Sequence, residues 1–175
     1  MRPLLRHGLA GEILSELQES VGTAFEGTFI YPPFLPKDVA GKRYVQIAHT
    51  SDVGIAAYGK STDELFANAA AGMFSLITDL RGVRNVGEYR VRLKGDTPED
   101  LMVAWLSELL YLHETEKLLF KQFDVKVRKN ALDAKVGGEV MDRGRHHLHM
   151  VVKAVTYHMI EVNPRKGVAK VIFDI

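Results

Sequence analysis

The sequence predicts an α+β domain in which two main helices pack with mostly antiparallel sheet. Two amphipathic helical patterns carry this prediction, one at 61–78 and one at 97–114, and each opens on a capping sequence. Four strand patterns then follow one another from residue 119 to the last residue. This succession excludes the regular β–α–β alternation of a parallel sheet, and the width of both apolar helix faces places the helices between sheets or deep against one.

The first 41 residues are predicted to be an N-terminal appendage of the main domain at 42–175. Apolar residues at helical spacing predict a short amphipathic helix at 9–21. The proline-rich stretch at 31–36 then breaks regular structure and is typical of a linker. The domain therefore begins near Lys42, after a helical segment and a linker whose role the sequence leaves open.

The two main helices have clear start sequences. Ser61 is the expected N-cap of the first helix, with Glu64 three residues later in the capping-box position. Thr97 is the expected cap of the second helix, followed by Pro98 at its first position. The strands expected around these helices are 43–48, 53–58, 88–94, 119–128, 132–141, 149–162 and 168–175.

Composition excludes several classes of function. The chain has no cysteine, which rules out disulfides, thiolate catalysis and iron–sulfur clusters. Its formal net charge of +1 gives no bulk electrostatic reason to expect direct nucleic-acid binding. No apolar run approaches the roughly 20 residues that span a bilayer, and glutamates interrupt any signal-peptide core near the N-terminus. We therefore expect a cytoplasmic protein with no membrane partner.

The last strand pattern places two negative charges together. The apolar positions Val171, Phe173 and Ile175 alternate with Lys170, Ile172 and Asp174, so the final segment is expected to be held in a sheet. This fixes the side chain of Asp174 next to the α-carboxylate of Ile175. Two fixed carboxylates repel each other unless a cation compensates them, and oxygen donors suit calcium or magnesium better than zinc or copper.

Other polar residues have a structural and a functional interpretation. Asp52 is most simply a turn residue between two strands, and His49 a hydrogen-bonded residue at a strand end. Lys153, inside a β-branched run, either extends along a sheet edge or serves a site, and spacing alone does not decide. The group His146, His147 and His149 is interpreted as the solvated start of a strand, with a metal site as the less favoured alternative.

Five ordered blocks of the domain resemble the archease family. They are AHTSDVGI at 48–55, AYGKS running into ELFANAA at 57–70, WLSELLY at 105–111, VKAVTYH at 152–158 and VIFDI at 171–175. The resemblance covers about 42–175 and is silent about the N-terminal segment. Ser51 stands where the family more often has alanine.

The resemblance implies a function and a site. Archeases are accessory factors of the RtcB-type RNA ligase in tRNA splicing and RNA repair, where they promote ligase guanylylation and multiple turnover. The family's divalent-metal site, calcium first with magnesium or manganese as alternatives, maps onto Asp52, Asp174 and Ile175. Its functional lysine maps onto Lys153, and His49 lies beside the same motif.

This implied role is that of a non-enzymatic activator. Three other functions stay open at this stage. One is a chaperone or modulator of a tRNA cytosine methyltransferase, an older label of the family. The second is a small metal-dependent hydrolase, for which His49 is the one candidate base that the sequence puts close to the acids. The third is a purely structural interaction module, which predicts no effect of metal ions.

Overall fold

The computed structural model describes residues 41–48 and 52–175. The predicted appendage helix at 9–21, the linker and His49 lie outside these residues. The elements in chain order are β1 (Tyr44–Ala48), β2 (Val53–Tyr58), α2 (Thr62–Ile77), β3 (Gly87–Lys94), α3 (Pro98–Glu116), β4 (Leu118–Arg128), β5 (Ala131–Val140), β6 (Ala154–Asn163) and β7 (Val168–Asp174).

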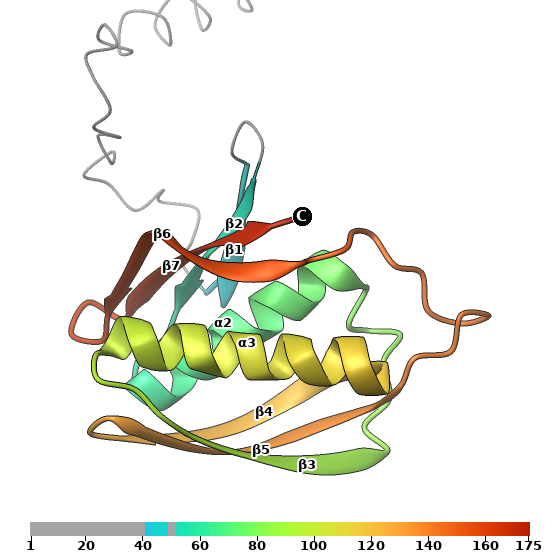
Figure 1. The fold of residues 1–175 in the computed structure, drawn as a ribbon, viewed down its shortest axis with the longest axis horizontal. Coiled ribbons are helices and arrows are strands. Elements are labelled where there is room, and N and C mark those ends of the chain that lie inside the picture. Colours follow the sequence, from blue (N-terminus) through green and yellow to red (C-terminus); the bar gives the residue numbers. More distant parts are fainter. Residues whose placement is uncertain (1–40, 49–51) are drawn as a thin grey trace, which may run out of the picture. The chain divides into compact units, whose positions relative to one another are not determined.

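The described part of the chain folds into three layers. One sheet has the strand order β1-β2-β7-β6 and the other has the order β3-β5-β4, with antiparallel pairing throughout. Helices α2 and α3 lie between the two sheets (Figure 1). Helix α2 contacts β2 and β4, and α3 contacts β6 and β3, so each helix touches both sheets. The predicted α+β class and the enclosed position of the helices are confirmed.

Both predicted helix caps form. The Ser61 hydroxyl accepts a hydrogen bond from the Glu64 main-chain N–H at 3.1 Å, while the Glu64 carboxylate accepts one from the N–H of Lys60. At α3 the box is reciprocal, because Thr97 accepts from the Asp100 N–H and the Asp100 side chain accepts from the Thr97 N–H. These bonds satisfy amides that a helix leaves open in its first turn.

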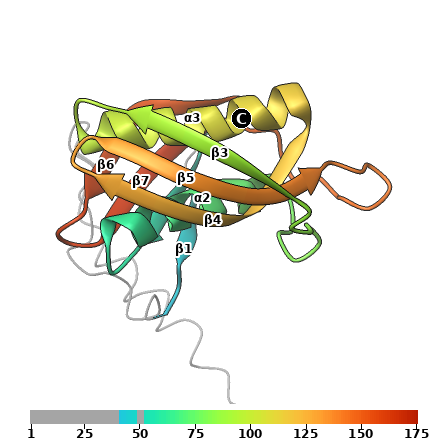
Figure 2. The same ribbon diagram turned by 90° about the horizontal axis from the view of Figure 1, so that it is seen from below.

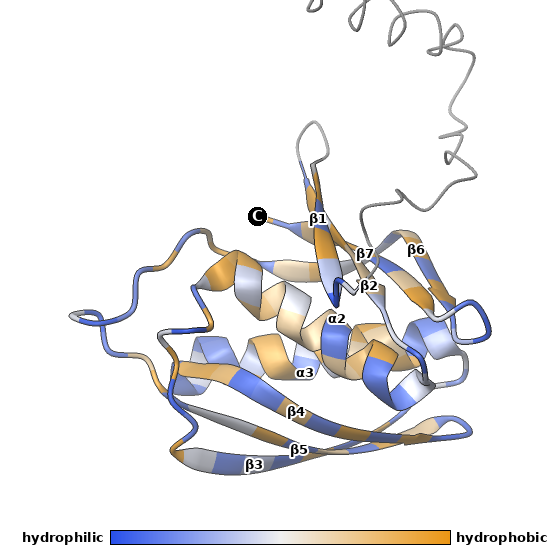
Figure 3. Ribbon diagram, turned by 180° about the vertical axis from the view of Figure 1, so that it is seen from behind, coloured by the Kyte–Doolittle hydropathy of each residue, from blue (hydrophilic) through white to orange (hydrophobic). Residues whose placement is uncertain are grey.

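The core fills the space between the sheets. Trp105 of α3 is fully buried, and its indole N–H donates to the Phe66 carbonyl of α2 at 3.1 Å, which ties the helices together. Phe74 of α2 packs edge-on against Phe120 of β4. The three-stranded sheet alternates hydrophobic and hydrophilic residues along its strands (Figure 3), so it has one buried and one outward face.

Two strand predictions need correction. The strand predicted at 149–162 begins only at Ala154, because the segment before it bonds to the end of α2. The His149 N–H donates to the Ile77 carbonyl, and the Thr78 hydroxyl donates to the His147 carbonyl. The last strand, predicted at 168–175, ends at Asp174, and its sequence alternation is not matched by burial because all residues from Ala169 to Phe173 are buried.

None of the helices in the described residues is both long enough and apolar enough to span a membrane.

Candidate functional site

The predicted acidic residues meet at one end of the four-stranded sheet. Strand β7 lies between β2 and β6, and its register pairs Phe173 with Val53. Asp52 precedes Val53 and Asp174 follows Phe173. Because the strands are antiparallel, the two aspartates occupy facing register positions just beyond the last pair. Figure 1 shows this end of β7, with the C-terminus beside β2.

Lys153 lies at the same end of the sheet, directly before β6, which flanks β7 on the side opposite to β2. Its main-chain N–H donates to the Asp174 carbonyl at 2.8 Å, which adds one hydrogen bond beyond the Ala154–Asp174 pair of the ladder. Its ammonium Nζ donates to a carboxyl oxygen of Ile175, also at 2.8 Å. The lysine thus fixes the backbone of one residue and partly compensates the negative charge of the next.

Buried neighbours hold the acidic end in place. Phe173 is fully buried immediately before Asp174, which is exposed. The Thr156 hydroxyl donates to the Ile172 carbonyl at 3.0 Å and adds a side-chain bond between β6 and β7. Gly54 of β2 allows β2 and β7 to pack closely, since a Cβ at this position would lie 2.6 Å from Ile172 Cδ1 of β7. Asp174 therefore lies at the end of a strand whose preceding residues are buried, and Asp52 and Ile175 directly adjoin strands β2 and β7.

The donor set matches the chemistry of a hard cation. Asp52, Asp174 and Ile175 offer carboxylate oxygens, the donors that calcium and magnesium prefer. Of these groups, the Ile175 carboxyl oxygen receives a direct hydrogen bond from the Lys153 ammonium. Within residues 41–48 and 52–175, no three His, Asp or Glu side chains gather into a group that could hold a metal ion. The predicted set has two such side chains and a main-chain carboxyl group, and it stays a prediction.

The sequence placed His49 and Asp52 beside one another. His49 lies outside the described residues, so its predicted role stays a prediction. Asp52 is half-buried. The structure therefore brings together Asp174, Ile175 and Lys153 by direct bonds, and brings Asp52 to them through strand register.

The histidine group does not form a solvated strand entrance. His146 is buried, and its Nδ1 accepts from the Asp142 N–H at 2.9 Å. Nε2 therefore carries the proton and lies 3.2 Å from the Glu139 carboxylate. Of the three histidines in this group, His147 and His149 are exposed. With both ring nitrogens of His146 engaged, the three histidines do not share one ligand set.

Sequence reasoning missed the partner of that histidine. Glu139 is nearly buried and pairs with the Arg145 guanidinium, which donates to both carboxylate oxygens. Hydrogen bonds from Arg145 first, and then from the Arg84 main-chain N–H, hold the pKa of Glu139 at about 2 despite its burial. A glutamate followed six residues later by an arginine has no distinctive pattern, so no sequence signal marks this pair.

The fold and site define a class of protein, a two-sheet α+β domain with enclosed helices and an acidic sheet end. The model of the Archease protein family (MTH1598/TM1083) matches residues 44–175. The chain belongs to the archease family, as its sequence blocks predicted.

Similar proteins agree with this assignment. The protein archease of Thermoplasma acidophilum is 37% identical over 132 residues, which span 75% of this chain and 93% of the relative. That of Methanothermobacter thermautotrophicus is 39% identical over 72% of this chain and 94% of its own length. The solution structure of Methanobacterium thermoautotrophicum protein 1598 is 36% identical, with a TM-score of 0.66, and covers 76% of this chain and 99% of that one.

Proposed function

We propose that this protein is a non-enzymatic activator of an RtcB-type RNA ligase in tRNA splicing and RNA repair. It promotes guanylylation of the ligase and allows repeated turnover. Membership of the archease family supports the proposal. The observation that carries it is the pair of hydrogen bonds from Lys153, one to Asp174 and one to Ile175.

The acidic end suits insertion into the cleft of a partner. Asp174 is exposed and follows a fully buried Phe173, so its carboxylate projects from a fixed base. Lys153 orients the neighbouring carboxyl group of Ile175. A charged group whose position is set before binding needs little reorganisation when it meets charge in the partner. Activation then consists of positioning the nucleotide phosphates electrostatically inside the active site of the ligase.

A divalent cation is part of the proposal. Asp52, Asp174 and Ile175 would hold calcium, with magnesium and manganese as the alternative ions. When bound, the ion would supply positive charge for the phosphate oxygens of the nucleotide in the partner. The role of the chain's own residues is to hold the oxygen donors together at the sheet end, with Lys153 limiting their mutual repulsion.

The ligase from the same organism tests the function directly. The full chain is used to capture the ligase, and guanylylation is then followed with labelled GTP, with and without this protein. The proposal predicts capture and a faster, multiple-turnover reaction. A ligase that is neither captured nor stimulated contradicts it, and phosphatase or nuclease activity of the purified chain alone would point instead to a hydrolase.

The metal assignment has its own test. Calorimetry with calcium is expected to show binding to the native chain and lost affinity in Asp174→Ala. Asp96→Ala is the matched control, because Asp96 is an exposed aspartate ahead of α3, outside the four-stranded sheet. Unchanged binding in Asp174→Ala would remove the metal from the proposal and leave the ligase test standing.

A further inference from the structure

The outward face of the three-stranded sheet is strongly basic. Strand register arranges nine outward positions in three rows across the sheet. The rows are Arg90–Lys135–Asp124, Arg92–Asp133–Lys126 and Lys94–Ala131–Arg128. Together they line a shallow depression of about 750 Å³. Six basic and two acidic side chains stand here, whereas the whole sequence has a formal net charge of only +1.

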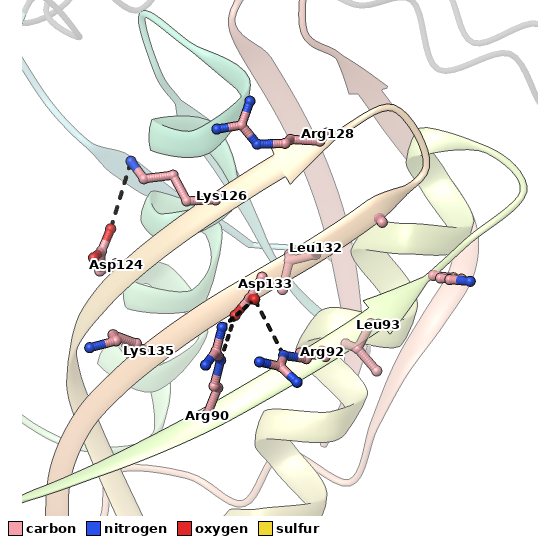
Figure 4. Close-up of a pocket in the computed structure, with 11 residues that line it drawn as sticks. Arg90, Arg92, Leu93, Asp124, Lys126, Arg128, Leu132, Asp133 and Lys135 are labelled. Atoms are coloured by element: carbon pink, nitrogen blue, oxygen red, sulfur yellow. Dashed lines mark hydrogen bonds and ion pairs between the residues drawn. The ribbon is translucent and has the colours of Figure 1, made fainter.

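Four of the six cations have acidic partners: Asp133 pairs with Arg90 and Arg92, Lys126 lies near Asp63 and Asp124, and Lys135 pairs with Glu88 of β3. These pairs position the cations but leave them exposed. Asp133 receives two hydrogen bonds from Arg90, at 2.9 and 2.6 Å, and a longer one of 3.3 Å from Arg92 (Figure 4). All three side chains are about half exposed, so the arginines keep donors available to solvent. Arginine with free in-plane donors is suited to phosphate.

The last row holds the most available charge. Lys94 and Arg128 are both exposed and stand on either side of Ala131. Neither forms an ion pair within the part of the chain that the structure describes. These two unpaired cations stand on the two outer strands of the sheet, β3 and β4, with β5 between them, and a bound polyanion would relieve their mutual repulsion.

The face offers no apolar anchor. Its one uncharged member is Ala131, and Leu132 points into the core, where it is buried. None of the large hydrophobic side chains exposed in the described residues stands in the three rows. Protein partners usually dock through aromatic or aliphatic anchors, and single-stranded nucleic acid stacks its bases on aromatic rings. The face meets neither requirement.

From this surface we infer that the basic rows bind double-helical RNA through its phosphates, without reading its sequence. A basic face without apolar anchors is suited to bind a phosphate backbone. The sheet, seen from outside in Figure 2, presents a broad surface rather than an inserting helix or loop, and the minor groove of an RNA duplex is wide and shallow. The choice of RNA over DNA rests on the proposed function. Net charge alone had predicted no direct nucleic-acid binding, because acids elsewhere in the chain mask this cluster.

Fluorescence anisotropy of the full chain with a labelled RNA hairpin of about twenty base pairs tests the inference. If about four phosphates are neutralised, affinity is expected to fall roughly 100-fold between 50 and 200 mM salt. A DNA duplex, a single strand of equal charge and a polyglutamate peptide are run beside it. Tightest binding of the RNA duplex supports the inference. No binding at 50 mM salt, or equal binding of any of the other probes, overturns it.

A pair of double variants locates the site. Lys94→Glu with Arg128→Glu is expected to weaken RNA binding by about tenfold or more and to reduce the salt slope by about two. Lys42→Glu with Arg143→Glu makes the same change in net charge at exposed positions outside this sheet and should bind nearly as the native chain. Equal weakening by both pairs overturns the assignment to the basic rows. Should the first pair misfold, the milder pairs Lys94→Gln with Arg128→Gln and Lys42→Gln with Arg143→Gln make the same comparison.

The test of RNA binding and the test of ligase activation can fail independently of each other. Guanylylation of the ligase is measured without RNA, so a chain that loses RNA binding is expected to keep its stimulation of guanylylation. Loss of stimulation in the Lys94→Glu, Arg128→Glu variant would contradict the division between the basic rows and the acidic sheet end.

Discussion

Lys153 bonds two consecutive residues through two different groups. Its main-chain N–H donates to the carbonyl of Asp174, and its ammonium donates to a carboxyl oxygen of Ile175, both at 2.8 Å. Lys153 therefore both extends the main-chain pairing of the sheet and compensates the negative charge of the Ile175 carboxyl group. This relationship gives Lys153 a defined role at the acidic end, which its position in a β-branched run had left undecided.

Replacing Lys153 separates its two contributions. Lys153→Met keeps the main-chain hydrogen bond and removes the ammonium, so the fold should persist while the Ile175 carboxyl group loses its orientation. We expect a change in melting temperature of less than about 4 °C, because exposed ion pairs contribute little to stability, and a clear loss of ligase stimulation. Lys166→Met, at an exposed position in the turn between β6 and β7, is the control. Full stimulation by Lys153→Met would show that the ammonium has no role in activation.

Gly54 sets the spacing between β2 and β7. A Cβ at this position would lie 2.6 Å from Ile172 Cδ1 and 2.9 Å from the Val171 carbonyl, and the carbonyl belongs to the paired strand. We expect Gly54→Ala to destabilise the protein by about 1–3 kcal/mol, as overpacking does, and to weaken ligase stimulation by displacing β7. Urea unfolding measures the first effect.

Gly82→Ala is the matched change for this test. Its nearest contact would be 3.4 Å from the Asp79 carbonyl, which is ordinary packing. It should leave stability nearly unchanged. Equal stability of the two variants would contradict the close packing of β2 on β7.

The partly buried pair of Glu139 and Arg145 predicts a specific pH dependence. The folded state holds the Glu139 pKa at about 2, below its ordinary value of 4.5, chiefly through the hydrogen bond from Arg145. The stabilisation is therefore complete above about pH 5 and is lost as the pH falls toward 2. Glu139→Gln is expected to cost about 2 kcal/mol at pH 7, and the difference from the native chain should shrink by pH 3.

Urea unfolding at pH 7 and pH 3 checks this dependence. Glu88→Gln is the control, since Glu88 pairs with Lys135 on the surface and should contribute little at either pH. A cost of Glu139→Gln that is the same at both pH values would contradict the lowered pKa.

Much of the fold follows from local pattern. Ser61 was predicted as a cap because Glu64 follows in the capping-box position, and Thr97 because Pro98 follows at the first helical position, and both are local signals. The antiparallel class followed from four successive strand patterns. The start of β6 at Ala154 could not be predicted, because the preceding residues bond to Ile77 and Thr78, more than sixty-five residues earlier.

The candidate site was predictable only in part. The alternating last strand indicated that Asp174 and Ile175 would be fixed together. The contribution of Asp52 came from the family resemblance, since no local pattern relates it to a strand more than a hundred residues later. The basic rows were not foreseen either. Arg92 and Lys126 share a face only through the register of β3, β4 and β5, which charge counts do not contain.

The initial rate of ligase guanylylation tests the central claim, that the acidic sheet end activates the ligase. The reaction is run with the native chain, with Asp174→Asn, and with Asp96→Asn as the control of equal charge change. We predict that Asp96→Asn stimulates as the native chain does and that Asp174→Asn loses about tenfold or more of the stimulation, the scale of one charged group acting on developing charge. Equal stimulation by both variants would contradict the claim.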